Sequence, residues 1–468
     1  MAEAFGQGFK KKCATFAETT FGSSTGTPSS ATNPLRIKRV SLTSTTPGDA
    51  YRDNHGRTRV GDVQKAQSFQ FSIETDLRPG PTQGTAPDGV EDILSKSGFD
   101  VGSNSGDTVQ ASPTPTATGF DIAAAGNFTN NELVVIDNAT DGAVVRQIKS
   151  GGGTTSLVVR PAMTTAPTTN DQVNNGISYL PNETMADAPD GFSIFSTMGD
   201  EAMQIGTGCV ADEITIEFGG DEQVRANYSG PCRSVAYTYE TQLDGAINNS
   251  VTSITVDNGE HFYPNTFLKI NSEAMIVTAV SGNTLTVTRG ADGTSAAAHS
   301  DNDAVVAYEW AQTFQSDAPI SSVDCNAYLW DGDTNTPQTL CITGGSVTIR
   351  NNVNPIGPKV GDTVTMGDYS VGIREVEGTL EGYLQVGDGS GRFARMFGEA
   401  HNRTNIGILI VCGTPSAAGG NVFALCCPQT YWENAEVDNS NDGVIPLSFN
   451  FQARGTATEN DEISLAFL

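Results

Sequence analysis

Most apolar residues of this chain lie in short runs that alternate with polar residues and end at Gly, Asn, Asp or Pro. Alternation over four to eight residues, with β-branched and aromatic side chains, is typical of a half-buried β-strand. Only residues 86–98 and 392–397 show helical patterns. The sequence therefore predicts a mainly β fold with a few short helices. The clearest predicted strands are 68–75, 213–218, 253–258, 284–289, 346–351 and 447–453.

Two stretches of the chain show the same order of predicted elements. The triplet Val-Gly-Asp at 60–62 recurs 300 residues later at 360–362, and each copy leads through an alternating strand to a predicted helix. Four elements in matching order favour a duplicated β-sandwich or barrel unit with one short helix per unit. The aligned strand pairs are 69–73 with 369–373, 191–198 with 406–411, and 210–218 with 422–425.

A second repeat explains why the two halves differ in length. Residues 117–179 and 244–308 resemble each other more than either resembles the larger units, and each predicts a four- or five-strand module. We expect these insertions on the outside of the parent units, because additions to a fold lie on its surface. The predicted organisation is a flexible N-terminal arm (1–35), a first unit (36–240) containing the module at about 117–179, a module (244–308) and a second unit (310–468).

The composition narrows the possible functions. The 468 residues include 26 Lys and Arg against 54 Asp and Glu, which gives a net charge of −28. This balance argues against a protein that binds nucleic acid by neutralising phosphates. No apolar run approaches the length of a membrane span, and residues 1–35 contain no apolar core of a secretory signal. The eight cysteines include no Cys-x-x-Cys, so we expect free, buried thiols.

Motifs of catalysis are missing from the sequence. It contains no Gly-x-Ser-x-Gly elbow, His-Glu-x-x-His pair or Walker loop, so we predict no catalytic residues, no cofactor and no metal site. The four histidines lie in or beside polar turns and are expected to be solvated. Carboxylate pairs such as Glu213/Glu217 and Glu375/Glu377 are expected on the polar faces of strands. Whether the turn at 438–442 binds an ion is left open.

Features suited to self-association are present instead. The N-terminal segment is punctuated by phenylalanines, among them Phe5 and Phe9, which are expected to find a groove on a neighbouring subunit. The proline-rich stretch 77–87, with Arg78, Pro79 and Pro81, is interpreted either as a plain surface loop or as an extended loop that reaches into an adjacent ring. Basic groups at 10–12 and 36–39 are expected to dock on acidic neighbours in the same assembly.

Six segments follow one another in a characteristic order of strands and turns: SFQFSIETDLRP, GVEDILSKSGF, residues 208–230, SVTIRNNVNP, REVEGTLEGYL and the closing segment 427–453. In this order, the chain resembles the major tail tube proteins of long-tailed bacteriophages of the siphovirus type. The resemblance covers most of residues 36–240 and 320–468, while 244–308 resembles a small module that recurs in phage structural proteins.

The resemblance implies a structural virion protein of the phage tail, made in the host cytoplasm and not an enzyme. Its implied partner is itself, in rings that stack into a tube for genome passage, along with other tail proteins and either a tape measure protein or genomic DNA in the lumen. Two units per chain favour three chains in a pseudo-sixfold ring, and six chains remain possible. Candidate contacts between rings are Phe5, Phe9, Arg78, Pro79 and Pro81.

Two other functions remain open at this stage. A secreted or surface β-rich protein could bind carbohydrate through aromatic platforms, for which Trp310, Trp330 and Trp432 are available. A β-sheet hydrolase or lyase is a third reading, although no pairing of nucleophile and base is visible.

Overall fold

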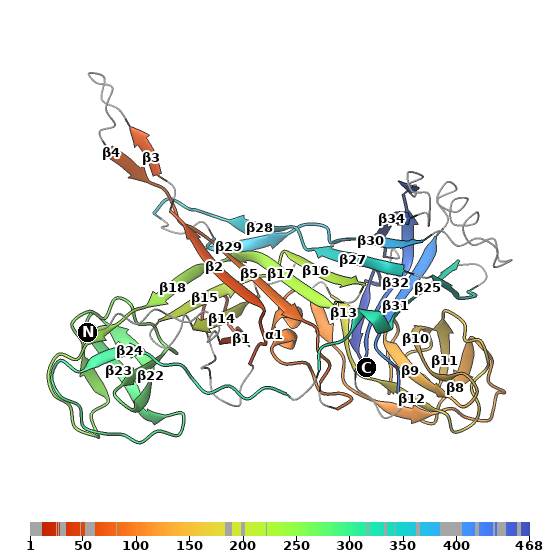
Figure 1. Ribbon diagram of the computed structural model, residues 1–468, viewed down its shortest axis with the longest axis horizontal. Coiled ribbons are helices and arrows are strands. Elements are labelled where there is room, and N and C mark those ends of the chain that lie inside the picture. The colour runs from red at the N-terminus through yellow and green to blue at the C-terminus, as the bar shows by residue number, and fades with distance from the viewer. Residues whose placement is uncertain are drawn as a thin grey trace.

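The computed structural model confirms the prediction of a mainly β protein. Antiparallel sheets dominate it, and a long central sheet crosses the molecule between two smaller sheets (Figure 1). The structure describes residues 12–24, 26, 28, 34–46, 48–51, 61–80, 82–182, 190–197, 202–220, 222–315, 318–331, 335–340, 342–361, 366–383, 405–416, 421–433, 436–437, 446–455 and 460–468.

The first unit packs two groups of four strands against each other. Phe71 from one group meets Phe192 from the other edge-on, with ring centroids 5.4 Å apart. One group runs β2 (Arg39–Thr45), β5 (Ser68–Asp76), β17 (Arg225–Cys232) and β16 (Glu213–Gly219). The other runs β1 (Cys13–Ala17), β14 (Phe192–Thr197), β15 (Met203–Cys209) and β18 (Ser234–Thr238).

The second unit has the same two groups. The comparison is made on the strands that the structure describes. One group runs β27 (Ile342–Arg350), β30 (Glu375–Tyr383), β34 (Pro446–Ala453) and β33 (Glu436–Val437). The other runs β25 (Cys325–Asp331), β31 (Ile406–Cys412), β32 (Phe423–Trp432) and β35 (Ser464–Phe467), with β26 (Gln338–Leu340) at the edge of β25.

The two units are equivalent strand by strand. The orders β2-β5-β17-β16 and β1-β14-β15-β18 recur as β27-β30-β34-β33 and β25-β31-β32-β35, with the strands in the same sequence along the chain. A hairpin lies at the same place in both, between β2 and β5 or between β27 and β30. These hairpins are β3 (Gly48–Tyr51) with β4 (Gly61–Gln64), and β28 (Val353–Ile356) with β29 (Asp368–Val371). This correspondence supports duplication.

The alignment made from the sequence is wrong in register. The first Val-Gly-Asp triplet leads into β4, whereas Val360 and Gly361 lie in the turn after β28. The strand equivalent to β5 is therefore β30, which starts 307 residues later, and not the segment 369–373. Likewise, β32 corresponds to β15 and not to β16. A constant offset fails because the triplet occupies different points of two hairpins whose connections differ in length.

The two small modules share one topology. The first module (residues 106–175) has the strand order β7-β12-β9-β10-β11-β8, and the second module (241–307) has the matching order β19-β24-β21-β22-β23-β20. Each therefore has six strands and its own apolar core. The strands are β7 (Gly106–Thr108), β8 (Gly119–Asp121), β9 (Leu133–Asn138), β10 (Gly142–Ser150), β11 (Ser156–Arg160), β12 (Gln172–Asn175), β19 (Thr241–Gln242), β20 (Ser253–Thr255), β21 (Phe267–Ile270), β22 (Glu273–Ser281), β23 (Thr284–Ala291) and β24 (Ala304–Ala307).

Each module covers the outer side of one unit. Leu133 and Val135 of the first module pack with Leu409 and Ala424 of the second unit. Phe267 of the second module packs in a cluster with Phe195 and Met203 of the first unit. The modules lie at opposite ends of the molecule (Figure 1). The first is joined to its parent unit by β6 (Phe99–Val101) and β13 (Ile177–Pro181), which pair with each other.

The predicted helix near residues 86–98 forms as α1 (Val90–Ser95). It begins after Gly89, which has a φ of +68°, and buries Val90, Ile93 and Leu94 in the core of the first unit. Acidic Glu91 and Asp92 occupy its first turn, where the helix dipole favours negative charge. The second predicted helix, 392–397, lies outside the described residues.

Part of the predicted flexible arm belongs to the fold. Residues 13–17 form β1, which pairs with β14 and buries Cys13, Ala14 and Phe16. The prediction of a flexible segment is therefore wrong for these residues. Short length and polar flanks hide this strand in the sequence, because its burial is supplied by β14 and by the second module.

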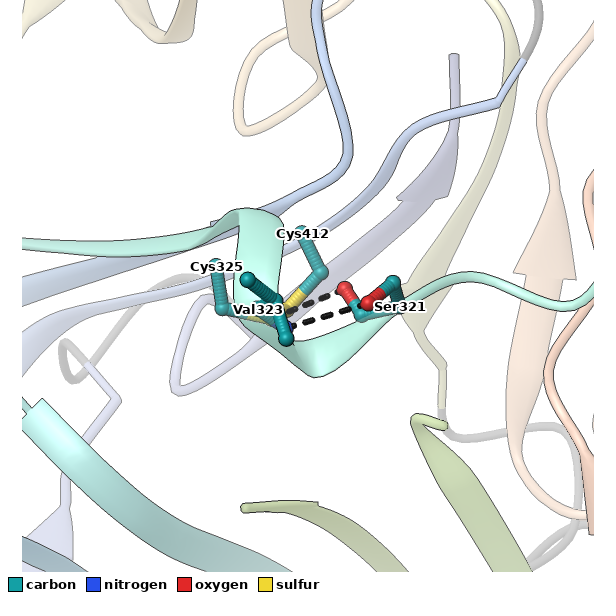
Figure 2. The surroundings of a disulfide bond; sticks show 4 residues. All are labelled: Ser321, Val323, Cys325 and Cys412. Atoms are coloured by element: carbon teal, nitrogen blue, oxygen red, sulfur yellow. Dashed lines mark hydrogen bonds between the residues drawn. A yellow bond between two sulfur atoms is a disulfide. The ribbon is translucent and has the colours of Figure 1, made fainter. Parts of the chain in front are cut away.

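The expectation of free thiols holds for only some of the cysteines. Cys325 and Cys412 form a disulfide between β25 and β31, where the two residues lie directly opposite each other (Figure 2). The side chain of Ser321 caps the short 3₁₀ turn, residues Ser322–Asp324, that leads into β25, accepting a hydrogen bond from the Val323 amide. Among the other described cysteines, five thiols are free and buried, namely Cys13, Cys209, Cys232, Cys426 and Cys427.

Candidate functional site

The two units share one uninterrupted sheet. Strand β16 of the first unit pairs antiparallel with β27 of the second, from Glu213 opposite Arg350 to Gly219 opposite Gly344. Ile214 and Ile216 from β16 and Val347 and Ile349 from β27 enter a single core cluster. Because side chains alternate along a strand, the residues between them all face the opposite side of the sheet.

That opposite side is a continuous polar surface, named here the polar sheet face. It extends over β2, β5, β17, β16, β27, β30 and β34, and its residues are exposed or half-buried where their side chains are described. Its large side chains are almost all polar, with Tyr383 at one end. The face carries Arg39, Ser41, Thr43, Thr45, Gln70, Ser72, Glu74, Asp76, Arg225, Asn227, Ser229, Glu213, Thr215, Glu217, Ser346, Thr348, Arg350, Glu375, Glu377, Thr379, Glu381, Tyr383, Ser448, Asn450 and Gln452.

The polar sheet face is acidic. Seven of its side chains are carboxylates and three are guanidinium groups. Arg350 lies at the boundary of the units, where its Nε donates to Glu213 at 3.0 Å and its Nη1 donates to Glu377. These hydrogen bonds, with Glu377 the stronger influence, raise the pKa of Arg350. The remaining carboxylates, including Glu217 and Glu381, leave the face with a negative potential. The expected positions of the carboxylate pairs are confirmed.

Small residues let the strands of this face approach closely. A Cβ on Gly378 would lie 2.6 Å from the carbonyl oxygen of Ser346 and 2.5 Å from the ring of Phe451. A Cβ on Gly345 would lie 2.5 Å from the carbonyl oxygen of Thr379. Glycine inside a strand often marks such an approach. Two open hollows lie on this face. Gly378 lines one of them and Gly345 lines the other.

The candidate contacts between rings are only partly described. Arg78 is half-buried and Pro79 is buried against its own chain. The adjacent Leu77 donates its amide to Val224 at 2.8 Å and accepts from Ile320 at 2.9 Å, which fixes the start of the loop. Phe5, Phe9 and Pro81 lie outside the described residues. A role of these five residues between rings stays a prediction.

Three residues of the basic groups at 10–12 and 36–39 have partners within the chain. The Nζ of Lys12 lies 2.9 Å from Glu309, and that of Lys38 lies 2.7 Å from Asp76. Arg36 donates to the carbonyl oxygen of Gln315. Docking on acidic neighbours is therefore not needed to satisfy these side chains, and the docking of these basic groups in an assembly stays a prediction.

Other candidate chemistry changes in the structure. His299, expected to be solvated, is buried in the second module with its Nε2 2.8 Å from Glu273. His261 is half-buried, while His55, His401 and the turn 438–442 lie outside the described residues. All three tryptophans are buried, so none offers an exposed carbohydrate platform. In the described part of the chain, His, Cys, Asp and Glu form no group that could hold a metal.

Among the residues that the structure places, no helix has the length and apolar character needed to cross a bilayer.

Comparison with known proteins points to one structural class. Residues 268–453, from β21 to β34, match the family model described as phage tail tube protein. The match confirms the resemblance to tail tube proteins and supports a structural protein of the phage tail. It spans most of the second unit and the second module from β21 onward.

The solved structures add only a distant likeness. One chain of the cryo-EM structure of the anti-feeding prophage (AFP) baseplate, 6-fold symmetrised, is 8% identical, with a TM-score of 0.24. The alignment covers 28% of this chain and 89% of that chain. No curated protein matches the chain.

Proposed function

We propose that this protein assembles into stacked rings that form a phage tail tube, through which the genome passes during ejection. The observation that carries the proposal is the acidic polar sheet face, which crosses from the first unit into the second without interruption. The family match supports the same reading. In this assembly the polar sheet face lines the lumen, and three chains supply six units per ring.

The chemistry of the face suits such a lumen. DNA is held on protein surfaces mainly by Lys and Arg at its phosphates. On the polar sheet face, carboxylates outnumber guanidinium groups, and Arg350 is already bound to Glu213 and Glu377. A negative wall repels phosphates. We infer that DNA slides past it without sequence-specific binding.

The further partners follow from this assembly. They are copies of the same chain, other tail proteins, and a tape measure protein or DNA in the lumen. The protein is made in the host cytoplasm, ends in the virion tail and performs no catalysis. Closing the sheet into a ring also pairs strand edges that would otherwise promote aggregation.

Negative-stain microscopy of the purified chain tests the assembly, and the protein mass per ring distinguishes three chains from six. Rings or tubes are expected, and a protein that stays monomeric at high concentration overturns the proposal. The lumen is tested with Glu217→Lys, Glu377→Lys and Glu381→Lys combined. Tubes of this variant should retain DNA at low salt and release it at high salt, because the attraction is electrostatic. Equal DNA retention by wild-type tubes would contradict an acidic lumen.

A further inference from the structure

The joint between the two units has two parts. The first is the pairing of β16 with β27, where the hydroxyls of Thr215 and Thr348 lie 3.1 Å apart on the polar sheet face. Just beyond β27, the buried Asn351 donates its side-chain amide to the carbonyl oxygen of Ala211 at 2.8 Å. The two units are thus joined where β27, the edge strand of one group in the second unit, pairs with β16, the edge strand of one group in the first unit.

The second part is the hairpin β28–β29, which lies across the first unit. The Val353 amide donates to Asp212 at 2.7 Å, and the Tyr369 hydroxyl donates to the carbonyl oxygen of Asp190 at 2.7 Å. Val353 and Tyr369 also pack with Val210 in a small apolar cluster. Burial raises the pKa of Tyr369 to about 12, with the charges of Asp190 and Asp368 adding to it and the backbone hydrogen bond from Asp190 opposing it. The Tyr369 hydroxyl therefore keeps its proton across the physiological range.

The elements equivalent to those of this joint are β2 and hairpin β3–β4 in the first unit and β33 in the second. Among the described residues, they form no such joint. Strand β2, equivalent to β27, pairs only with β5 among the described residues, and hairpin β3–β4 pairs only within itself. Figure 1 shows this hairpin standing clear of the body of the molecule. In the second unit, β33, equivalent to β16, is paired with β34 and with no other described strand.

We infer that the joint inside the chain is repeated between chains: β2 of one copy pairs antiparallel with β33 of the next, and hairpin β3–β4 lies across the second unit of that copy. The inference rests on the proposed ring and names its contact. The contact is head-to-tail, so it produces a closed ring if the rotation closes. With three chains, joints within and between chains alternate around the ring.

Paired cysteines test the strand contact in assembled protein. Glu436→Cys in β33 is combined with Ser41→Cys or with Thr43→Cys in β2, and thiols are oxidised with copper–phenanthroline. Thr215→Cys with Thr348→Cys is the matched control, because these residues lie directly opposite each other within one chain. One of the two β2 pairs should give covalent dimers and trimers on a non-reducing gel, with nothing longer, and the single variants should give none.

The outcomes separate the contact from the function. If rings form and the control disulfide within one chain forms, but neither β2 pair gives covalent dimers, the contact between β2 and β33 is overturned and the proposed tube is not. Covalent dimers from Ser41→Cys or Thr43→Cys alone also overturn it, because they show β2 paired with itself. Unmodified protein that forms no rings overturns both.

Shortening the hairpins tests the second part. Replacing residues 48–64 by an Asn-Gly turn should leave the folding of the single chain unchanged and raise the concentration at which rings appear by about tenfold or more. The matched shortening of 353–371 removes the Asp190 and Asp212 contacts and should lower the thermal stability of the single chain. Unchanged assembly in the first variant, with normal folding, contradicts docking of β3–β4.

Discussion

The two small modules share a strand order but differ in how they are held. The second module encloses a buried charge cluster, in which Glu273 accepts hydrogen bonds from Arg289 at 2.7 and 2.8 Å. In the first module, the buried Gln147 donates to the Ser464 hydroxyl of the second unit at 2.7 Å. Both modules pack on a larger unit, but the buried charge cluster belongs to the second module and this buried side-chain hydrogen bond across an interface belongs to the first.

The difference teaches how an inserted module keeps its fold. In the second module, Glu273 accepts hydrogen bonds from the amides of Gly290, at the end of β23, and Ala297, in the turn that follows. The ring of His299 is also hydrogen-bonded to Glu273. A buried carboxylate satisfied in this way specifies one turn conformation. The first module gains specificity from the surface on which it lies, so it should depend more on the second unit.

The largest effect is expected from Glu273→Gln. The amide removes the charge beside Arg289, whose side chain is 6% exposed, and leaves a buried cation without its ion pair. Removing one partner of a buried pair should lower the free energy of unfolding by about 4 kcal/mol. Denaturant unfolding followed by fluorescence of Trp310, which packs beside the second module, measures this. Exposed Glu260→Gln is the control, and equal midpoints for the two variants would contradict the role of Glu273.

Leu133→Ala tests the interface of the first module. Leu133 is fully buried among residues of the second unit. Its truncation leaves a cavity and should cost about 3.5 kcal/mol, with faster amide exchange in β31 and β32. Val158→Ala, on an exposed position of the same module, should change little. A variant as stable as this control would show that the interface does not hold the module.

Acid should weaken the second module selectively. Burial alone would raise the pKa of Glu273, but hydrogen bonds from Arg289, Ala297, His299 and Gly290 lower it from 4.5 to about 2. A lowered folded-state pKa gives stability that is present above pH 4.5 and lost as the pH falls towards 2. The stability difference between wild type and Glu273→Gln should shrink by about 3 kcal/mol over this window. A difference independent of pH would exclude ionised Glu273 as its source.

The smallest effect is expected from Ser464→Ala. It removes one hydrogen bond between the first module and β35, worth about 1 kcal/mol. Urea unfolding with Ser448→Ala, on the polar sheet face, as control resolves it. A loss of several kcal/mol would mean that the interface depends on this bond more than on Leu133.

Alternation made much of the fold predictable. The predicted strand at 68–75 is β5, that at 213–218 is β16, and that at 447–453 falls in β34, because each buries every second residue. The polar positions of Glu213 and Glu217 follow from the same period. The sequence did not show that β16 and β27 are neighbours, because strand pairing is set by tertiary packing.

The disulfide and the burial of His299 could not be predicted from the neighbouring sequence. Cys325 and Cys412 are 87 residues apart and meet only because β25 pairs with β31. His299 lies in a polar stretch of sequence, yet it is buried because Glu273 offers it a partner. The resemblance to tail tube proteins identified the class of protein. The polar sheet face, in contrast, could be recognised only from the strand order in the structure.

The pairing of β16 with β27 determines how the protein behaves at low concentration. Because both strands belong to one chain, each is presented to the other at an effective concentration that does not depend on the amount of protein in solution. The sheet that joins the two units therefore forms in every single chain, and its first joint does not wait for a collision between molecules.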